Sequence, residues 1–418
     1  MNILYSFFVV IVWFLSTYFS IVLLLIILTE KPRFHKNPVF YSTDRFPKVS
    51  ILVPVYNEGE KVIETIDSLN AVDYPKDKLE IIILNDGSKD NTSEVVRNAL
   101  KRSDISKNMV FVDNENNKGK AATLNQGISL ATGEFLATMD GDSEVPADIL
   151  KKTVPFFKKE DVGAVTVTVE VKDPKTLLQK IVEIEYVIGL SLALKALSFF
   201  NAIHVTPGPF SVYRKSVLDE IGGFDINNIT EDHEIALRIY KAGYKIDNCT
   251  STKVRTISPG TFKTLYTQRK RWYTGSLLTL WQHRDIMLKR KYGFFSFIYP
   301  YTYLLVTCGL LLFSLTIYLS VKNLFKSLSF FHLTNFNFFS HISFRMIDLL
   351  TISTLTIFGA IAIFTTVTFA TVCLRVAKKD IRTRMPGFVG FVFLFFLYQI
   401  FWGSSIISAL TRRKVKWR

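Results

Sequence analysis

Two aspartates after an apolar run are the first residues with obvious chemistry. The segment FLATMDGDSEV at 135–145 places Asp140 and Asp142 on either side of one glycine. Paired carboxylates at the end of a buried strand repel each other and lose solvation, unless a cation lies between them. Mg²⁺ takes carboxylate oxygens together with substrate phosphates, and the glycine would allow a tight turn and the approach of a bulky ligand. An Asx-type turn is the simpler alternative.

A second acidic motif opens a predicted helix at Thr230-Glu231-Asp232. In one interpretation Thr230 is the N-cap, and the two acids only interact favourably with the helix dipole. In the other, Asp232 is a general base that removes a proton from a sugar hydroxyl as that hydroxyl attacks an anomeric carbon.

A basic aromatic helix is predicted around YTQRKRWYTG at 266–275, with Gln268, Arg271 and Trp272 on one face. Arginine offers a charged fork to diphosphate oxygens, and tryptophan offers a flat apolar surface to a sugar ring. The alternative is a basic amphipathic helix on a membrane surface. The two interpretations are compatible.

The elements that must position these motifs are short apolar strands alternating with helices from about 48 to 255. This alternation predicts βαβ units and a mostly parallel sheet. Ligands of such sheets bind beyond the carboxyl ends of the strands. We therefore expect Asn57–Glu58, Asp86–Gly87 and Asp140–Asp142 at one edge of the sheet.

Two further segments between the strands carry expectations. Residues 176–200 are amphipathic and too polar in their first half to cross a bilayer, so they predict an interfacial helix. Within TPGPFSVYRKSVLDEIGGFD (206–225), the Pro-Gly-Pro loop could shape a pocket, although glycine and proline also mark ordinary turns.

Four long apolar stretches identify an integral membrane protein: 4–28, 295–320, 349–377 and 387–410. The first is too long for a signal-peptide core and has no basic residue before it, so we read it as an anchor. Basic residues after this stretch predict an outside N-terminus and residues 30–294 inside the cell.

The charge distribution agrees with this topology except at one point. The loop at 375–384 is basic, as expected for the cytoplasmic side, but four spans would leave the basic tail at 411–418 outside. A miscounted span could lie in 324–348. The net charge of +15 is concentrated at membrane flanks and around 263–290, which favours anionic lipids and a phosphate-bearing substrate over nucleic acid. The three cysteines have no metal or disulfide spacing.

The order PVYNE, NDGS, NKGKAATLN, DGD, TED and QRKRW resembles the processive family-2 glycosyltransferases, which include cellulose, hyaluronan, chitin-oligosaccharide and poly-N-acetylglucosamine synthases. The resemblance covers about 48–280. It implies an α/β GT-A fold, a UDP-sugar donor, Mg²⁺ or Mn²⁺ as cofactor, and inversion at the anomeric carbon.

The resemblance also implies roles for individual residues. Asp232 would be the catalytic base, Asp142 and Asp140 would bind the metal, and two further groups would bind the nucleotide and the acceptor. The nucleotide group is Tyr56, Glu58, Asp86, Lys120, Asp140, Gln268, Arg271 and Trp272. The acceptor group is Gly208, Pro209, Phe210, Glu231 and Trp272. His233 departs from the arginine that is common after TED in hyaluronan-type enzymes.

These observations predict a multi-pass enzyme of the plasma membrane with a cytosolic catalytic domain. Expected regions are an N-terminal transmembrane helix (1–30), a GT-A domain (31–262), interfacial helices with QRKRW (263–294) and about three spans (295–418). The expected activity is extension of a polysaccharide from a UDP-sugar such as UDP-GlcNAc. The alternatives are transfer of one sugar to a membrane lipid and, from another class, a transporter, which the absence of mid-span ionisable residues disfavours. The sequence leaves the oligomeric state open.

Overall fold

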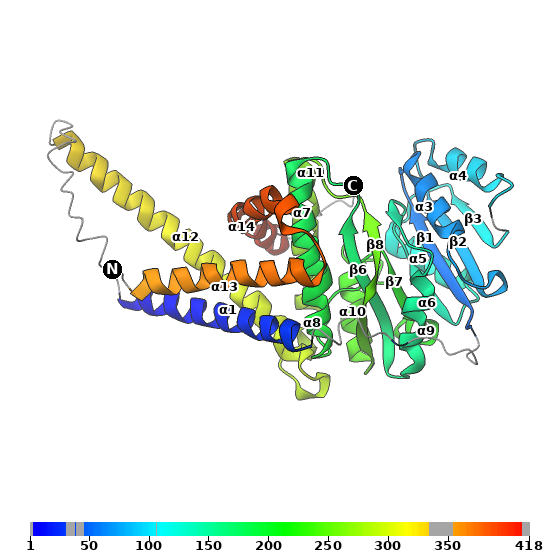
Figure 1. The fold of residues 1–418 in the computed structure, drawn as a ribbon, viewed down its shortest axis with the longest axis horizontal. Coiled ribbons are helices and arrows are strands. Elements are labelled where there is room, and N and C mark those ends of the chain that lie inside the picture. The colour runs from blue at the N-terminus through cyan, green and yellow to red at the C-terminus, as the bar shows by residue number, and fades with distance from the viewer. Residues whose placement is uncertain (1–2, 31–37, 39–45, 106, 334–353, 412–418) are drawn as a thin grey trace. The chain divides into compact units, whose positions relative to one another are not determined.

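The structure is a computed structural model that describes residues 3–30, 38, 46–105, 107–333 and 354–411. The chain divides into two compact units. One consists of Met1–Leu25 with Tyr301–Val372, and the other of Ile26–Pro300 with Cys373–Arg418. The second unit contains the whole β-sheet and every motif singled out in the sequence (Figure 1).

The first half of the sheet is parallel, as the alternation of strands and helices predicts. Its strands lie in the order β3-β2-β1-β4. The strands are β1 (Val49–Val55), β2 (Leu79–Asp86), β3 (Met109–Asn114) and β4 (Phe135–Thr138), and the helices that join them are α3 (Lys61–Asn70), α4 (Thr92–Leu100) and α5 (Lys120–Leu130).

The second half of the sheet is mixed. Strand β7 (Ser211–Arg214) pairs antiparallel with both β4 and β6 (Val162–Val171). Strand β8 (Lys245–Thr256) runs parallel to β6, and the two-residue β5 (Ser143–Glu144) closes the edge antiparallel to β8. The resulting eight-stranded sheet is the mostly parallel α/β fold that the sequence predicts, with antiparallel pairs added after β4.

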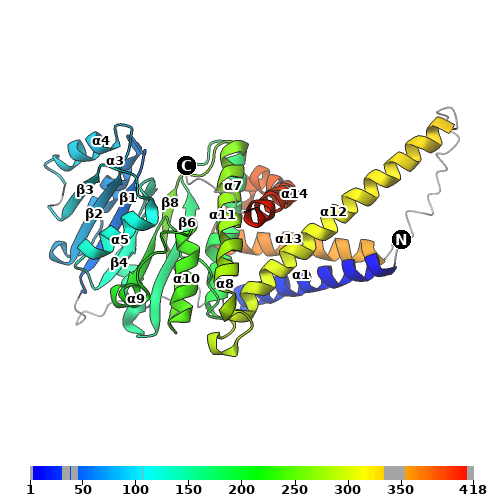
Figure 2. The same ribbon diagram turned by 180° about the vertical axis from the view of Figure 1, so that it is seen from behind.

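Helices cover both faces of the sheet (Figures 1 and 2). Successive side chains of a strand point to opposite faces, and β1 demonstrates this directly. Its Ile51 and Val53 belong to the core cluster that includes Ile66 of α3, whereas Leu52 lies against Gly127 of α5. Because both faces are covered, β1 is buried along its whole length and is apolar except for Ser50.

The remaining helices of this unit pack against the second half of the sheet or against one another. Helix α7 (Leu177–Tyr186) continues through a π-helical stretch, Val187–Ala193, into α8 (Leu194–Ser198), which corresponds to the helix predicted at 176–200. Its location at a membrane surface stays a prediction. The others are α6 (Ile149–Thr153), α9 (Lys215–Ile221), α10 (Glu231–Lys241), α11 (Phe262–Gln282) and α14 (Ile381–Leu410).

Helix α14 packs against α7 and α11. The ring of Trp402 on α14 stacks on Tyr273 of α11 with centroids 4.2 Å apart. A Cβ at Gly390 would lie 2.5 Å from the side chain of Ile181 on α7. The last apolar helix of the chain therefore packs within the unit that contains the sheet.

The other unit is helical. It contains most of α1 (Ile3–Thr29), α12 (Phe295–Leu333) and α13 (Thr354–Val376). Val9 and Val12 of α1 pack against Leu312 of α12, and the Tyr301 hydroxyl donates a hydrogen bond to the Leu15 carbonyl over 3.0 Å.

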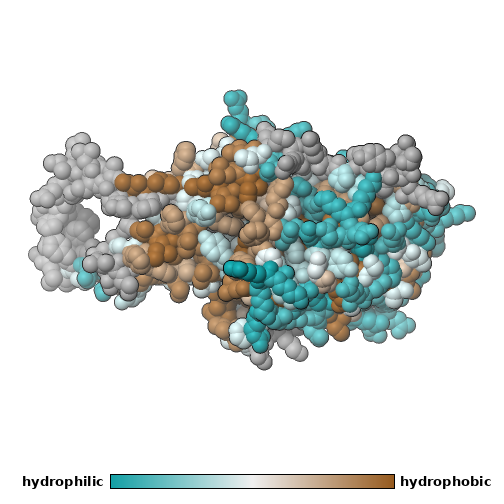
Figure 3. All heavy atoms as spheres, turned by 90° about the horizontal axis from the view of Figure 1, so that it is seen from below, coloured by the Kyte–Doolittle hydropathy of each residue, from teal (hydrophilic) through white to brown (hydrophobic). Residues whose placement is uncertain are grey.

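By length and composition, two described helices could cross a membrane: Ser6–Thr29 and Phe295–Lys326. Ile381–Leu394 and Leu397–Leu410, bent by 46°, could together form a third, whereas Ile363–Val376 is apolar but shorter. The predicted count of four stays a prediction, because much of 324–348 and nearly all of the tail lie outside the described residues. Figure 3 shows hydrophobic residues gathered over the long helices and hydrophilic residues over the α/β part.

Candidate active site

The strand-end motifs meet at one edge of the sheet, as predicted. Strand β1 is flanked by β2 and β4, and both run parallel to it. Tyr56 and Glu58 follow the end of β1, Asp86 is the last residue of β2, and Asp140 comes two residues after β4. Because the three strands point the same way, their carboxyl ends open on a common edge.

Hydrogen bonds tie the first two of these loops together. The Thr92 hydroxyl accepts the backbone N–H groups of Glu58 and Gly59, over 2.9 and 2.8 Å. Asn57 has a positive φ of 54° and accepts the N–H of Lys89 at 2.8 Å. The PVYNE and NDGS loops are therefore held as one structure, and sequence reasoning missed the contribution of Thr92 to it.

Asp86 braces the loop that precedes α5. Its two carboxylate oxygens accept the backbone N–H groups of Lys118 and Gly119, over 2.7 and 3.0 Å. The Asp86 residue is 2% exposed. The observed role is to fix the NKGK loop and so to aim Lys120; the predicted contact of Asp86 with uridine stays a prediction.

Lys120 joins the DGD and TED motifs. Its Nζ lies 2.6 Å from Asp140 Oδ1 and 2.9 Å from Glu231 Oε1. Burial disfavours the ammonium, but the charges of Asp140, Glu231 and Asp232 more than offset this, so the pKa of Lys120 is raised above its ordinary value. Lys120 is therefore a permanent cation between two acidic motifs that are 91 residues apart in the sequence.

The Pro-Gly-Pro loop passes beside this ion pair. A Cβ at Gly208 would lie 2.7 Å from Lys120 Nζ and 3.0 Å from Asp140 Oδ2, so a larger residue would require these side chains to shift. Thr206 donates its N–H and its hydroxyl to the Asp232 carbonyl oxygen, over 3.0 and 2.8 Å. The loop, which ends with Pro209, therefore lies beside Asp140 and is hydrogen-bonded to the first turn of α10.

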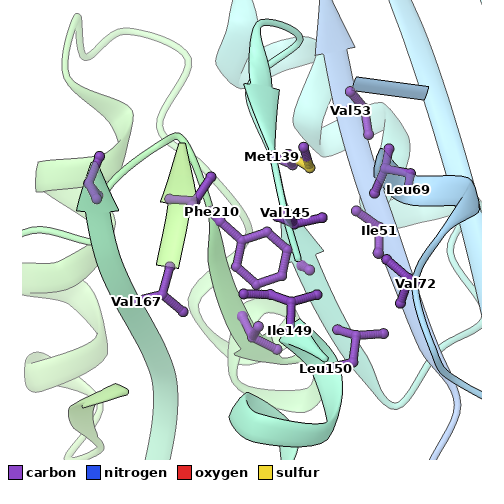
Figure 4. Close-up of a cluster of buried hydrophobic side chains, with 14 of the residues drawn as sticks. Ile51, Val53, Leu69, Val72, Met139, Val145, Ile149, Leu150, Val167 and Phe210 are labelled. Carbon is purple, nitrogen blue, oxygen red and sulfur yellow. The ribbon is translucent and has the colours of Figure 1, made fainter. Parts of the chain in front are cut away.

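Phe210 differs from the rest of the Pro-Gly-Pro loop in its burial. Its side chain is 0% exposed and belongs to the same hydrophobic core cluster as Met139, Val145 and Ile149 (Figure 4). Phe210 immediately precedes β7, so a contact with a sugar would require its ring to leave the core. The acceptor roles of Gly208, Pro209 and Phe210 stay predictions.

Asp232 begins α10 and is partly buried. Burial and the neighbouring Glu231 raise its pKa to about 6, while Lys120 and Arg271 act in the opposite direction. Thr230 takes the N-cap position, but its hydroxyl makes no capping bond and donates to Asn228 Oδ1 over 3.1 Å. Simple capping therefore does not account for the motif.

Helix α11 packs closely against the TED motif. A Cβ at Gly275 would lie 2.4 Å from the Thr230 hydroxyl oxygen. Arg271 Nη1 donates to the Ile229 carbonyl over 3.3 Å, and Arg271 lies near enough to Asp232 to affect its pKa. The structure thus brings the QRKRW helix to the same site as TED, Lys120 and DGD.

Arg269 is the functional candidate that sequence reasoning missed. Its residue is 0% exposed, although QRKRW looks like a basic surface. The guanidinium carbon lies 4.2 Å from the Trp272 ring centroid, and Nη1 donates to Gln268 Oε1 over 2.5 Å. Its acidic partner, Glu185, is 84 residues away in the sequence, so no local pattern pointed to it.

The acids that could hold a divalent metal are Asp140 and Asp142. Asp142 accepts the Thr256 hydroxyl over 3.3 Å, and Asp140 is paired with Lys120. Within the described residues, no group of three or more His, Cys, Asp or Glu side chains could hold a metal by itself. Gly141, between these two acids, allows close packing against β1, because a Cβ there would lie 2.8 Å from the Val55 side chain. The sequence pattern instead suggested that this glycine allows the approach of a ligand.

A separate hollow of about 460 Å³ lies at the other side of β5. It is lined by charged residues, including Glu144, Glu170, Glu183 and Lys379. Lys379 Nζ contacts Glu170 Oε1 and Glu183 Oε1 over 3.2 and 3.5 Å. The acidic and basic side chains of the hollow pair with one another. The ion pair between Lys379 and Glu170 connects the 377–384 loop to the sheet.

A mixed sheet of this order, with acidic motifs at the ends of parallel strands and helices on both faces, is the GT-A fold. The structure is similar to a mannosyltransferase from Pyrobaculum calidifontis solved in complex with GDP-Man and Mn²⁺, with a TM-score of 0.61 and 20% identity over 97% of this chain and 100% of that chain. At this identity the likeness shows the fold alone.

Sequence comparison gives a match to one family model. Residues 50–222 match the model described as Glycosyl transferase family 2. It is 35% identical over 228 residues to a poly-beta-1,6-N-acetyl-D-glucosamine synthase of Staphylococcus epidermidis, and 31% identical over 265 residues to one of Staphylococcus aureus. The matches cover 54% and 63% of this chain and equal shares of those relatives.

Proposed function

We propose that this protein is a membrane-embedded inverting glycosyltransferase that extends a polysaccharide from UDP-GlcNAc. The observation that carries the proposal is the contact of Lys120 with both Asp140 and Glu231, because it joins a diphosphate-type motif to the motif of a general base. The choice of sugar rests on the two staphylococcal relatives, whose names specify poly-N-acetylglucosamine synthesis.

The donor would bind along the common strand edge. Tyr56, Glu58 and Asp86 would hold the uridine, and Lys120 with Arg271 would hold the diphosphate through charge-assisted contacts. The rigid hydrogen bonds of Thr92 and Asp86 support this assignment, since preformed loops lower the cost of ordering a ligand.

Asp232 would act as the base. Its carboxylate takes the proton of the acceptor hydroxyl while that oxygen forms a bond to the anomeric carbon of the donor. The bond between the anomeric carbon and the diphosphate breaks, and UDP leaves with the electron pair. A base with a pKa near the working pH is well matched to this task, and the pKa of Asp232 is about 6.

The residues fit a divalent metal that arrives with the nucleotide. Mg²⁺ and similar ions need only one or two protein carboxylates when phosphates and water complete the coordination, and Asp140 and Asp142 supply two. When bound, the metal would neutralise charge on the diphosphate. Lys120 would then share Asp140 with the metal or turn towards the phosphates.

Gly208, Pro209, Glu231 and Trp272 are the proposed acceptor residues. Helices with the length and hydropathy of membrane spans support a membrane site for the growing glycan, with the catalytic unit on the cytosolic side of the plasma membrane. A single transfer to a membrane lipid is the second candidate, because helices with the length and hydropathy of membrane spans would bring the protein into contact with lipids.

The test is incubation of purified full-length protein with a panel of radiolabelled UDP-sugars. We expect UDP release with UDP-GlcNAc above the other donors, and a product of many sugar units on gel filtration. A labelled product that extracts into organic solvent with a single sugar would favour the lipid acceptor. Absence of UDP release with every donor would contradict glycosyl transfer altogether.

A further inference from the structure

The Arg269 side chain is buried where three helices meet. Its Nη2 donates to Glu185 Oε2 of α7 over 2.7 Å, and the hydroxyl of Tyr398 on α14 donates to the same oxygen. The carboxylate therefore holds a guanidinium from α11 and a phenol from α14 at once. A buried charge is tolerated only when it is paired in this way.

The same guanidinium touches two residues of the proposed site. Nη1 donates to Gln268 Oε1 over 2.5 Å, and the guanidinium carbon lies 4.2 Å from the centroid of the Trp272 ring. The Trp272 ring also stacks with Tyr186, whose ring centroid is 6.5 Å away, and the guanidinium carbon lies 5.9 Å from the Tyr186 centroid. A planar, five-donor cation can serve the amide, the ring and the carboxylate together.

We propose that Arg269 is a positioning residue: anchored by Glu185, it sets the orientation of Gln268 and Trp272 towards the reacting sugars. The proposal rests on the function proposed above. The positioning role of the buried Arg269 differs from the role of Arg271, which is only partly buried and contacts the residue before TED. It also makes α14, through Tyr398, a support of the active site.

A purely structural role for Arg269 makes a different prediction. Replacing a buried ion pair by apolar residues of similar volume is often neutral or stabilising. Helix packing alone would therefore tolerate methionine at position 269, with neutral glutamine at 185, and transfer would persist. Orienting the Gln268 amide and the Trp272 indole requires the planar, multiply donating guanidinium of arginine. Lysine and methionine both lack such a group.

The experiment compares Arg269→Lys, the pair Arg269→Met with Glu185→Gln, and Glu185→Gln alone in full-length protein held in lipid nanodiscs. Lys263→Gln is the control, because it removes an exposed cation from the same helix. Three quantities are measured: thermal unfolding, UDP affinity, and kcat and KM for transfer from UDP-GlcNAc. Near-UV circular dichroism, with and without Trp272→Phe, isolates the signal of the stacked indole.

We expect Arg269→Lys to lower kcat by roughly 100-fold, as for a misplaced catalytic group, while the Kd for UDP changes less than about threefold. The Trp272 signal should disappear in both Arg269 variants and weaken in Glu185→Gln. Lys263→Gln should match the wild type in every measurement.

Any folded Arg269 variant that transfers at the wild-type rate overturns the proposal. If both Arg269 variants fail to fold, Glu185→Gln decides, and an unchanged Trp272 signal with an unchanged kcat overturns it. Absence of transfer by the wild-type protein would instead refute the proposed function, which keeps the two failures apart.

Discussion

Lys120 on α5 and Glu231 on α10 form an ion pair, with Nζ 2.9 Å from Oε1 and the two side chains 12% and 6% exposed. The partner on its other side is Asp140, over 2.6 Å. One cation thereby joins the DGD and TED motifs.

Lys120→Met should abolish most of the transfer activity. The change leaves the buried Glu231 and the partly exposed Asp140 without this partner and removes a cation from the proposed diphosphate site. Loss of one preorganised electrostatic group costs roughly 100- to 1,000-fold in rate, and kcat measured with UDP-GlcNAc should fall by that amount.

Lys118→Met is the matched control for this change. Lys118 lies in the same loop, its side chain is exposed, and only its backbone N–H contacts Asp86. Equal activity of the two variants would contradict the assignment of Lys120.

The rate of transfer should depend on the ionisation of Asp232. Burial and Glu231 raise its pKa to about 6, and only the carboxylate can accept a proton. We therefore expect kcat to rise with pH through about 6 and then to level off. Asp232→Asn should remove transfer at every pH while retaining UDP binding. A flat profile between roughly pH 5 and 8 would contradict the base assignment.

The ionisation of Asp232 should lower the stability of the protein as pH rises, whereas it should raise kcat. The folded pKa of Asp232 lies above its unfolded value of 3.8, so the folded state binds more protons between these values, and the contribution of this group to stability falls as pH rises through them. Comparing unfolding temperatures of the wild type and Asp232→Asn over this interval checks the sign. The asparagine variant should lack this component.

Gly275→Ala should loosen the contact between α11 and TED. The new methyl would lie 2.4 Å from Thr230, and overpacking of a tight contact costs about 1–3 kcal/mol. We expect a lower unfolding temperature together with lower transfer activity. Gly189→Ala is the control, because nothing lies within 4 Å of a Cβ at that helical position; the same small effect in both variants would show that the α11 contact is not tight.

The strand-end geometry could be predicted from the sequence because it follows from local patterns. Apolar runs that end in Asp86 and Asp140 predicted parallel strands with a common edge, and the structure has them. The antiparallel pairing of β7 with β4 was not predicted, since Ser211–Arg214 is too short for a periodic signal.

Burial was the part of the site that the sequence could not reveal. Phe210 follows a Pro-Gly-Pro loop that reaches Asp140, yet its own ring turns into the core. Arg269 carries the same charge as its neighbour Lys270, yet it is buried because Glu185 and Tyr398, from helices distant in the sequence, pack around it. Both outcomes depend on tertiary packing, which residue spacing does not encode.

Removal of divalent cations should stop turnover. With only Asp140 and Asp142 from the protein, a metal would be held mainly by the diphosphate, so EDTA should strip it readily. Transfer from UDP-GlcNAc should vanish in EDTA and return with excess Mg²⁺ or Mn²⁺. Full activity in the chelator would rule out the metal role of the DGD motif.

The central claim is that acids at neighbouring strand ends bind a nucleotide diphosphate beside a separate base. Calorimetric titration of UDP with Mn²⁺ into the wild type, Asp142→Asn and Asp232→Asn tests it most directly. We predict metal-dependent binding by the wild type and Asp232→Asn, and its loss in Asp142→Asn. Equal UDP affinity in all three proteins, with or without Mn²⁺, would contradict the claim.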